Sequence, residues 1–199
     1  MMTWYDEAIS RIKKFQKEDN LLILDVGAGL GHLSHKLKNH FKDARIVALD
    51  LNAENMKAIR LRPEQLESFD IECCQEDAGE SSFRDGVFDI TVSAFSLQYW
   101  QHPIKVLNEV YRLTRPEGRF LITDLRRDMS ESTVKKIARL SSLNNPGTNA
   151  KDIEIFLKLR LDRCYTPNEA AKLARKSKLK NWRVTNREYG FYLESLPIV

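Results

Sequence analysis

Residues 21–37 bring one acid and three glycines together at a spacing that suits ligand binding. Asp25 follows an apolar run, and Gly27, Gly29 and Gly31 come directly after it. The run, the glycines and the helical spacing that follows predict a buried strand, a tight turn and the start of a helix. Glycine allows a ligand close to the backbone, and a helix start supplies N–H groups. We therefore expect this turn, including Ala28, to hold a polar ligand.

The spacing of the glycines indicates what kind of ligand this is. A dinucleotide site has the pattern G-x-G-x-x-G and places a pyrophosphate on the helix start. Here the pattern is D-x-G-x-G-x-G, with the acid before the first glycine. A carboxylate at Asp25 would repel a pyrophosphate but would attract a ligand that carries an ammonium group. The pattern therefore disfavours NAD.

Further acids lie where two later strands are predicted to end. Residues 45–51 form a predicted strand with Asp50 near its end, about 20 residues past the turn, where a carboxylate suits a ribose diol. Residues 71–78 form a short third strand that ends at Asp77, with Glu76 beside it. The apolar run 87–100 predicts a fourth strand and breaks at Ser93. Ligands of parallel sheets bind beyond such strand ends.

Residues 21–125 resemble the class I methyltransferases that depend on S-adenosylmethionine (SAM). The resemblance rests on the glycine turn, on Asp50, and on the block of an amphipathic helix at 104–114, the turn and the strand RPEGRFLITDL. Glu117 stands where glycine is commoner. Among these methyltransferases, residues 21–125 most resemble the small-molecule group that includes ubiquinone and menaquinone C-methyltransferase-like enzymes.

The resemblance implies an α/β, Rossmann-like fold with strand order 3-2-1-4-5-7-6. Strand 7 is antiparallel, helices cover both faces, and a helical insertion follows strand 5. It implies SAM as cofactor and S-adenosylhomocysteine (SAH) as product. Asp77 or Glu76 would accept from the adenine amino group, a choice that stays open. The implied cofactor-binding residues are Asp25, Gly27, Ala28, Gly29, Gly31, Asp50, Leu51, Asp77, Ala78, Ser93 and Phe95.

Tyr99 is the candidate catalytic residue. It follows the fourth strand, beside the expected position of the reactive methyl group, where it could orient a nucleophile. Tyr99 and Trp100 equally suit simple packing. No acid follows strand 4 directly and His32 and His35 have no further ligands nearby, so no metal is implied.

The remaining segments complete the expected organisation of one domain over residues 1–199. Residues 4–17 have the spacing of an amphipathic helix, which favours a helix that docks on the sheet; alternatively, Trp4 or Tyr5 could fold over the cofactor site. Residues 20–125 would form the SAM-binding half and 126–165 a lid or a dimer surface. Within 126–165, the segments 130–143 and 152–164 are predicted to be helices, although the apolar residues of 152–164 also alternate as in a strand. Residues 166–199 predict a helix with a capping box and a closing hairpin.

Composition limits the classes of function. The 199 residues carry a net charge of +4, with no apolar stretch of 18 residues and no secretory signal. Three cysteines without a C-x-x-C pair indicate a reducing, cytoplasmic setting. Residues 126–199 hold 16 Lys and Arg but only 8 Asp and Glu, an excess that suits an anionic substrate, RNA or a plain solvated surface.

Three functions remain open at this point. The first is methyl transfer from SAM to a small molecule, and the second is the same chemistry on RNA or protein through the basic C-terminal part. The third is a non-catalytic SAM-binding protein or the partner subunit of another methyltransferase. The sequence does not specify the acceptor atom or the oligomeric state.

Overall fold

The computed structural model describes residues 4–14, 20–61, 71–144 and 147–196. Its centre is a seven-stranded sheet with the order β3-β2-β1-β4-β5-β7-β6, as predicted. The strands are β1 (Leu22–Val26), β2 (Arg45–Asp50), β3 (Ile71–Gln75), β4 (Phe88–Ala94), β5 (Thr114–Leu125), β6 (Trp182–Asn186) and β7 (Gly190–Ser195). The first five run parallel, and β7 is antiparallel to both β5 and β6.

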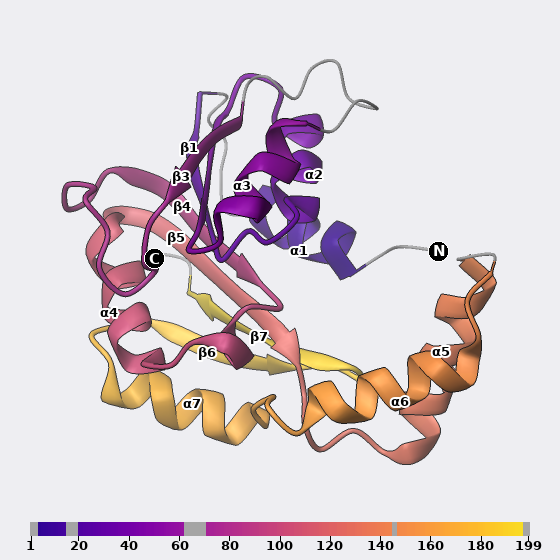
Figure 1. Ribbon diagram of the computed structural model, residues 1–199. Helices are drawn as coiled ribbons and strands as arrows, with labels where there is room; N and C mark the ends of the chain where they lie inside the picture. The colour runs from indigo at the N-terminus through magenta and orange to yellow at the C-terminus, as the bar shows by residue number, and fades with distance from the viewer. Residues whose placement is uncertain (1–3, 15–19, 62–70, 145–146, 197–199) are drawn as a thin grey trace.

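Helices cover both faces of the sheet (Figure 1). α1 (Trp4–Lys13), α2 (His32–His40) and α3 (Ala53–Arg60) lie on one face, and α4 (Pro103–Leu113) and α7 (Pro167–Lys176) lie on the other. The period of two along a strand explains this. In β1, Ile23 packs into the core with α1 and α2, whereas Leu24 packs into the core with α4. Strands buried on both sides read as continuous apolar runs, which is how β1 reads.

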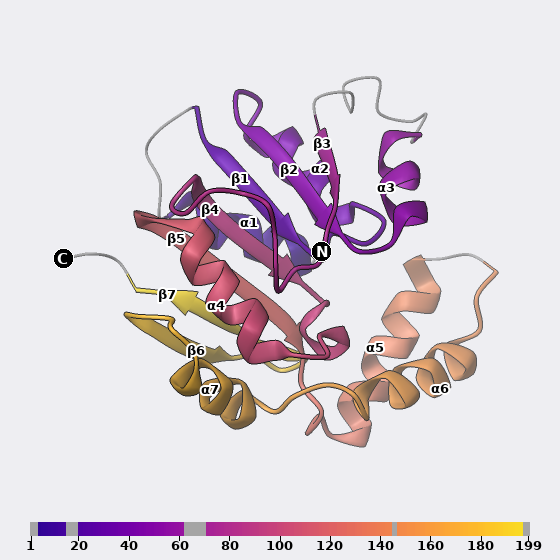
Figure 2. The same cartoon turned by 60° about the vertical axis from the view of Figure 1, so that its left-hand side comes forward.

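The insertion after β5 consists of two helices, α5 (Glu131–Asn144) and α6 (Ala150–Leu161). They pack on each other and extend from the end of β5 away from the sheet (Figures 1 and 2). The helical interpretation of 152–164 is confirmed. Leu157 and Leu161 lie on one side of α6 and pack in one cluster with Val134 and Ala138 of α5. A strand would have placed Leu159 with them, but Leu159 is 67% exposed.

Several predicted boundaries differ from the structure. The third strand ends at Gln75 and not at Asp77, which forms an isolated bridge with Glu80. The first helix ends at Lys13, and the part of the prediction over residues 15–17 lies outside the described residues. The capping box of the C-terminal helix is confirmed, with Thr166 and Glu169 bonding each other's backbone N–H. None of the described helices is both long and apolar enough to cross a membrane.

Candidate active site

The glycine turn lies between the ends of β1 and β2. The N–H groups of Gly27 and Ala28 both donate to Leu49 O, at 2.8 and 3.0 Å. Gly29 N donates to Asp50 Oδ2 at 2.8 Å, and Gly31 N donates to Ala28 O at 2.9 Å. These four N–H groups therefore already donate to protein oxygens. A pyrophosphate would need free N–H donors and would meet two carboxylates instead.

The three glycines of the turn all have positive φ, but their surroundings differ. A Cβ on Gly27 would lie 2.6 Å from Ser96 Cβ, and one on Gly31 would lie 2.6 Å from Ile59. Those two glycines are required by close protein packing. A Cβ on Gly29 would meet no atom within 4 Å. The open side of the turn is therefore at Gly29, next to Asp50.

Asp25 is buried at 1% exposure, on the α1 and α2 face of the sheet. Ser34 Oγ on α2 donates to its Oδ2 at 2.6 Å. The pKa of Asp25 is raised to about 7, chiefly by burial; the hydrogen bond from Ser34 opposes the rise, and the nearby Asp50 contributes to it. A cation placed beside Asp25 would remove this penalty, so the site favours an ammonium group over an anion.

Asp50 still has room for a ligand. Its Oδ1 accepts from Asn52 N at 2.9 Å and from Asn55 Nδ2 at 3.1 Å, while Oδ2 accepts from Gly29 N. An ionised carboxylate offers about four acceptor positions. One position on Oδ2 thus stays available on the side where Gly29 is open, and the donor it needs could be a ribose hydroxyl. Leu51, the next residue, is 68% exposed.

The loop after β3 distinguishes Glu76 from Asp77. Glu76 accepts from Ser82 N through one oxygen and from Ser82 Oγ through the other, at 2.8 and 2.5 Å. Asp77 accepts from Gly79 N through Oδ1 at 2.7 Å, and its Oδ2 accepts from no donor among the described residues. β3 pairs with β2 so that Gln75 lies opposite Asp50. Asp77 and the half-buried Ala78 thus follow at the same sheet edge as Asp50.

Aromatic rings from distant segments surround Phe95 at the end of β4. Trp4 and Tyr5 of α1 lie 5.9 and 5.6 Å from it between ring centroids. Phe95 itself has a φ of 59°, which is unusual for a bulky residue and marks a strained turn. Trp4 Nε1 donates to Thr123 Oγ1 on β5 at 2.8 Å, which fixes the start of α1 over the strand ends. Trp4 and Tyr5 thus contact Phe95 at the end of β4 while α1 packs on the sheet.

The predicted residues Ser93 and Tyr99 have contrasting positions. Ser93 is buried, and its Oγ lies 2.5 Å from Ser96 Oγ. Ser96 in turn donates to Val26 O and fills the space beside Gly27. Ser93 therefore supports the turn through Ser96. Tyr99 lies in the short helix η2 (Leu97–Tyr99) and is 56% exposed.

A polar group that the sequence did not reveal lies beside Phe95. Arg160 of α6 donates from Nε to Gln98 Oε1 at 3.1 Å, and its guanidinium lies 5.5 Å from the Phe95 ring and 6.0 Å from the Tyr99 ring. Gln98 Nε2 donates to Asp124 Oδ1 at 3.1 Å. Burial raises the pKa of Asp124 to about 6, while Arg160 lowers it. The insertion thus brings a cation to the ends of β4 and β5.

Comparison with known proteins agrees with this fold. A family model described as a methyltransferase domain matches residues 24–122, about half the chain. Together with the strand order 3-2-1-4-5-7-6, the match shows that the chain belongs to the class I methyltransferases. A solved SAM-dependent methyltransferase from Aquifex aeolicus has a similar fold, with a TM-score of 0.72 and 16% identity over 99% of this chain and 91% of that one.

The chain is also similar in sequence to curated methyltransferases whose names refer to quinone biosynthesis. Demethylmenaquinone methyltransferase from Thermus thermophilus is 32% identical over 102 residues, which are 51% of this chain and 46% of the relative. The ubiquinone/menaquinone biosynthesis C-methyltransferase UbiE from Rickettsia prowazekii is 29% identical over 146 residues, 71% of this chain and 57% of the relative. The chain thus spans about half the length of the curated relatives it matches.

Within the described residues, no group of three or more His, Cys, Asp and Glu side chains is arranged to hold a metal ion. All three cysteines are free thiols, with Cys73 and Cys74 in β3 and Cys164 buried after α6. Burial raises the pKa of the Cys164 thiol to about 12, so it stays protonated and inert.

Proposed function

We propose that this chain is a methyltransferase that uses SAM and acts on a small-molecule acceptor. One observation carries the proposal: the turn at Gly29 is open, and it is bordered by Asp25 and Asp50 while its amides are spent on protein oxygens. Such a site suits a ligand with an ammonium group and a diol. It does not suit the pyrophosphate of a dinucleotide.

The chain's own residues have separate roles in this proposal. Asp25 holds the ammonium group of the cofactor, Asp50 accepts from its ribose hydroxyls, and Asp77 with Ala78 N–H meets its adenine. Asp77 is preferred to Glu76 because both oxygens of Glu76 already accept from Ser82. SAM supplies a methyl group that its sulfonium charge has already activated. The protein must then align the acceptor and exclude water.

We infer that the acceptor binds between Phe95, Tyr5, Tyr99 and the guanidinium of Arg160. These aromatic rings suit a planar, largely apolar molecule, and the cation suits an oxygen that carries negative charge during the reaction. The quinone biosynthesis named for the relatives fits this description. The segment 126–165 then acts as the lid, since it supplies Arg160. Tyr99 lines the acceptor side and helps to orient the nucleophile.

The free thiols favour a reducing compartment, and we place the reaction in the cytoplasm. The two other functions, methylation of RNA or protein and a non-catalytic partner role, remain the alternatives. A small acceptor is preferred because the guanidinium of Arg160 lies over the rings of Phe95 and Tyr99.

Thermal unfolding with SAM, SAH and NAD tests the cofactor. A ligand at roughly 100 times its dissociation constant adds about 2.7 kcal/mol to the stability of the folded state. We expect SAM and SAH to raise Tm and NAD to leave it unchanged. Asp50→Ala should weaken SAH binding by about 100-fold, since it removes charged hydrogen bonds to a diol. Stabilisation by NAD alone, or by none of the three, would refute the cofactor assignment.

Arg160→Gln tests the acceptor side separately. We expect SAH binding to stay within about twofold of wild type, because Arg160 bonds Gln98 and Phe95 O and no residue of the glycine turn. Methyl transfer to a demethylquinol acceptor should fall by about 100-fold, as expected when a group that stabilises developing charge is lost. Lys158→Gln, two residues before Arg160 on α6 and half-exposed, is the control. Equal losses in both variants would contradict the role of Arg160.

A further inference from the structure

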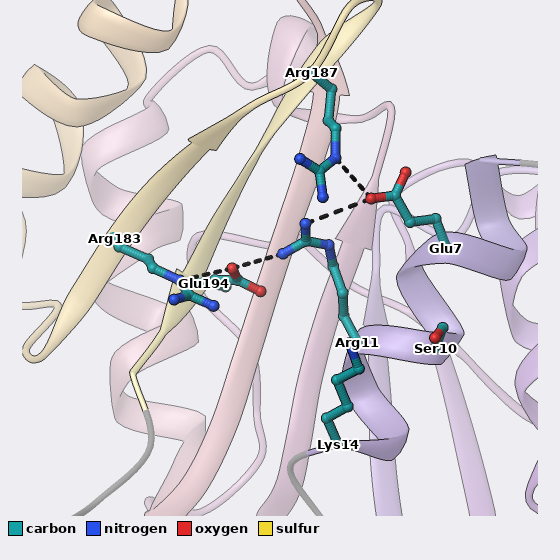
Figure 3. A pocket seen from close by; sticks show the side chains of 7 residues that line it. All are labelled: Glu7, Ser10, Arg11, Lys14, Arg183, Arg187 and Glu194. Carbon is teal, nitrogen blue, oxygen red and sulfur yellow. Dashed lines mark hydrogen bonds and ion pairs between the residues drawn. The ribbon is translucent and has the colours of Figure 1, made fainter.

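A second cavity lies away from the glycine turn, between α1 and the hairpin of β6 and β7. Its volume is about 370 Å³, and Figure 3 shows the side chains that line it. Three come from α1, one directly follows α1, and three come from the hairpin with its connecting turn. They are Glu7, Ser10, Arg11, Lys14, Arg183, Arg187 and Glu194.

The lining carries more positive than negative charge. Arg11 Nη1 and Arg183 Nε both donate to Glu194 Oε1, at 2.8 and 2.9 Å. Arg187 Nε donates to Glu7 Oε1 at 2.7 Å. Lys14 adds a fourth cation against the two carboxylates. The cavity therefore has a net excess of two positive charges.

The ion pairs leave part of the hydrogen-bonding capacity unused. Arg183 meets Glu194 through Nε, which leaves its two terminal nitrogens for a ligand, and its side chain is 52% exposed. Glu194 is fully buried, and among the described residues neither its Oε2 nor the buried Arg11 Nε has a hydrogen-bond partner. A network built only to fasten α1 would be expected to satisfy these buried atoms. The terminal nitrogens of Arg183 and the Nε of Arg11 are donors that suit an anion, whereas Glu194 Oε2 is an acceptor and would need a hydroxyl group of the ligand.

We propose that this cavity binds a small phosphomonoester as its dianion. A phosphate ester carries close to two negative charges at neutral pH, which matches the excess of two. Guanidinium groups match phosphate oxygens in geometry, and Arg183 and Arg187 present them from one hairpin (Figure 3). A volume of about 370 Å³ suits a small molecule. Occupancy would brace α1, whose Tyr5 contacts Phe95 in the candidate active site.

Isothermal titration calorimetry of the full chain with inorganic phosphate and with glycerol 2-phosphate tests the proposal. We expect saturable binding of both at constant ionic strength. The double variant Arg183→Gln/Lys14→Gln should weaken it by about tenfold or more, since it removes charged donors. The Arg11–Glu194 pair that fastens α1 remains in this variant, while Glu194 loses its second partner, Arg183; Lys14→Gln alone leaves both pairs intact and should weaken binding in the same direction. Lys172→Gln, exposed on α7 away from the cavity, should bind as wild type does.

Two further measurements decide between this site and a general basic surface. Backbone hydrogen exchange of α1 should slow in the presence of glycerol 2-phosphate and should not in the double variant. Absence of saturable binding, or equal weakening by Lys172→Gln, would overturn the proposal. Tighter binding of a short single-stranded RNA that Lys172→Gln also weakens would indicate a polyanion surface instead. SAH binding, followed on the same samples, reports separately on the proposed methyltransferase site.

Discussion

Asp25 is held in an environment that opposes its own charge. It is buried, and its pKa is raised to about 7 chiefly by that burial. In the protein without ligand the carboxyl is thus about half protonated near neutral pH. A cation beside it would favour the carboxylate. Ligand binding should therefore release a proton from Asp25 below pH 7.

The first prediction is that the affinity for SAH depends on pH, because binding releases a proton from Asp25. SAH binding should be about tenfold weaker at pH 6 than at pH 8, because the ammonium group binds the ionised carboxyl. Calorimetry in two buffers of different ionisation enthalpy should detect the released proton. Asp25→Asn should bind weakly at both pH values. Ser34→Ala should move the transition to higher pH, because Ser34 lowers the pKa of Asp25. A pH-independent affinity would contradict the prediction.

The second prediction concerns stability without ligand. Because the pKa of folded Asp25 lies above its ordinary value of 3.8, the folded state binds more protons between about pH 4 and pH 7. The free energy of unfolding should thus fall as pH rises through this window. Asp25→Asn keeps an acceptor for Ser34 and removes the charge, so it should raise that free energy by about 1–3 kcal/mol at pH 8. Urea unfolding at pH 5 and pH 8 would measure it, and destabilisation at pH 8 would count against it.

The residues near the glycine turn could be predicted from the sequence, because spacing along a strand and turn fixes their positions. Asp25 and Asp50 meet through neighbouring strands, and Asp50 bonds Gly29 directly. Arg160 could not be predicted in this way. It lies in α6, a helix whose exposed side carries apolar residues as well as Lys and Arg, and the packing of α6 on α5 turns this cation toward Gln98.

At the scale of elements, the start of α1 depends on the close approach of β7. Trp4 stacks on Tyr192 at 5.3 Å and bonds Thr123 on β5. Gly190 opens β7 directly beneath it. A Cβ there would lie 2.1 Å from Asp124 O and 2.7 Å from the Trp4 ring. Only glycine lets the strand, the helix and the acid at the end of β5 meet.

The third prediction follows from that contact. Gly190→Ala should lower the free energy of unfolding by about 2–4 kcal/mol, since backbone and ring must both move. It should also change the fluorescence of Trp4. Gly79→Ala is the matched control, because its Cβ would meet the flexible Lys105 side chain first, at 3.1 Å. Denaturant unfolding of both variants would decide, and equal effects would show that the contact at Gly190 is unimportant.

Helices and strands could be predicted where the spacing of apolar residues, or a capping motif, fitted only one type of element. The alternating segment 181–195 gave the hairpin, and the capping box gave α7. Their ends were less predictable. The third strand stops at Gln75 because its continuation turns to bond Ser82 and Gly79, a local choice that apolar patterning does not encode.

At the scale of the whole molecule, an ion pair joins segments 183 residues apart in sequence. Arg11 on α1 donates to the fully buried Glu194 on β7, and its guanidinium lies 4.3 Å from the Tyr192 ring. The fourth prediction is that Arg11→Ala lowers the free energy of unfolding by about 3 kcal/mol, because it leaves a buried charge with one fewer partner. Lys14→Ala, one turn later and exposed, should cost less than about 0.5 kcal/mol. Equal costs in thermal unfolding would contradict this.

The position of β7 also has a consequence for how the molecule forms. This strand lies between β5 and β6, and α1 packs on it although the two are at opposite ends of the described chain. A ribosome makes α1 long before β7, so α1 and the aromatic group around Phe95 have no strand to pack on until β7 has been synthesised. Pairings this distant in sequence also make folding slow. During synthesis the glycine turn would form well before the β6–β7 hairpin, and the nascent chain would expose Trp4 and Tyr5 until that hairpin docks.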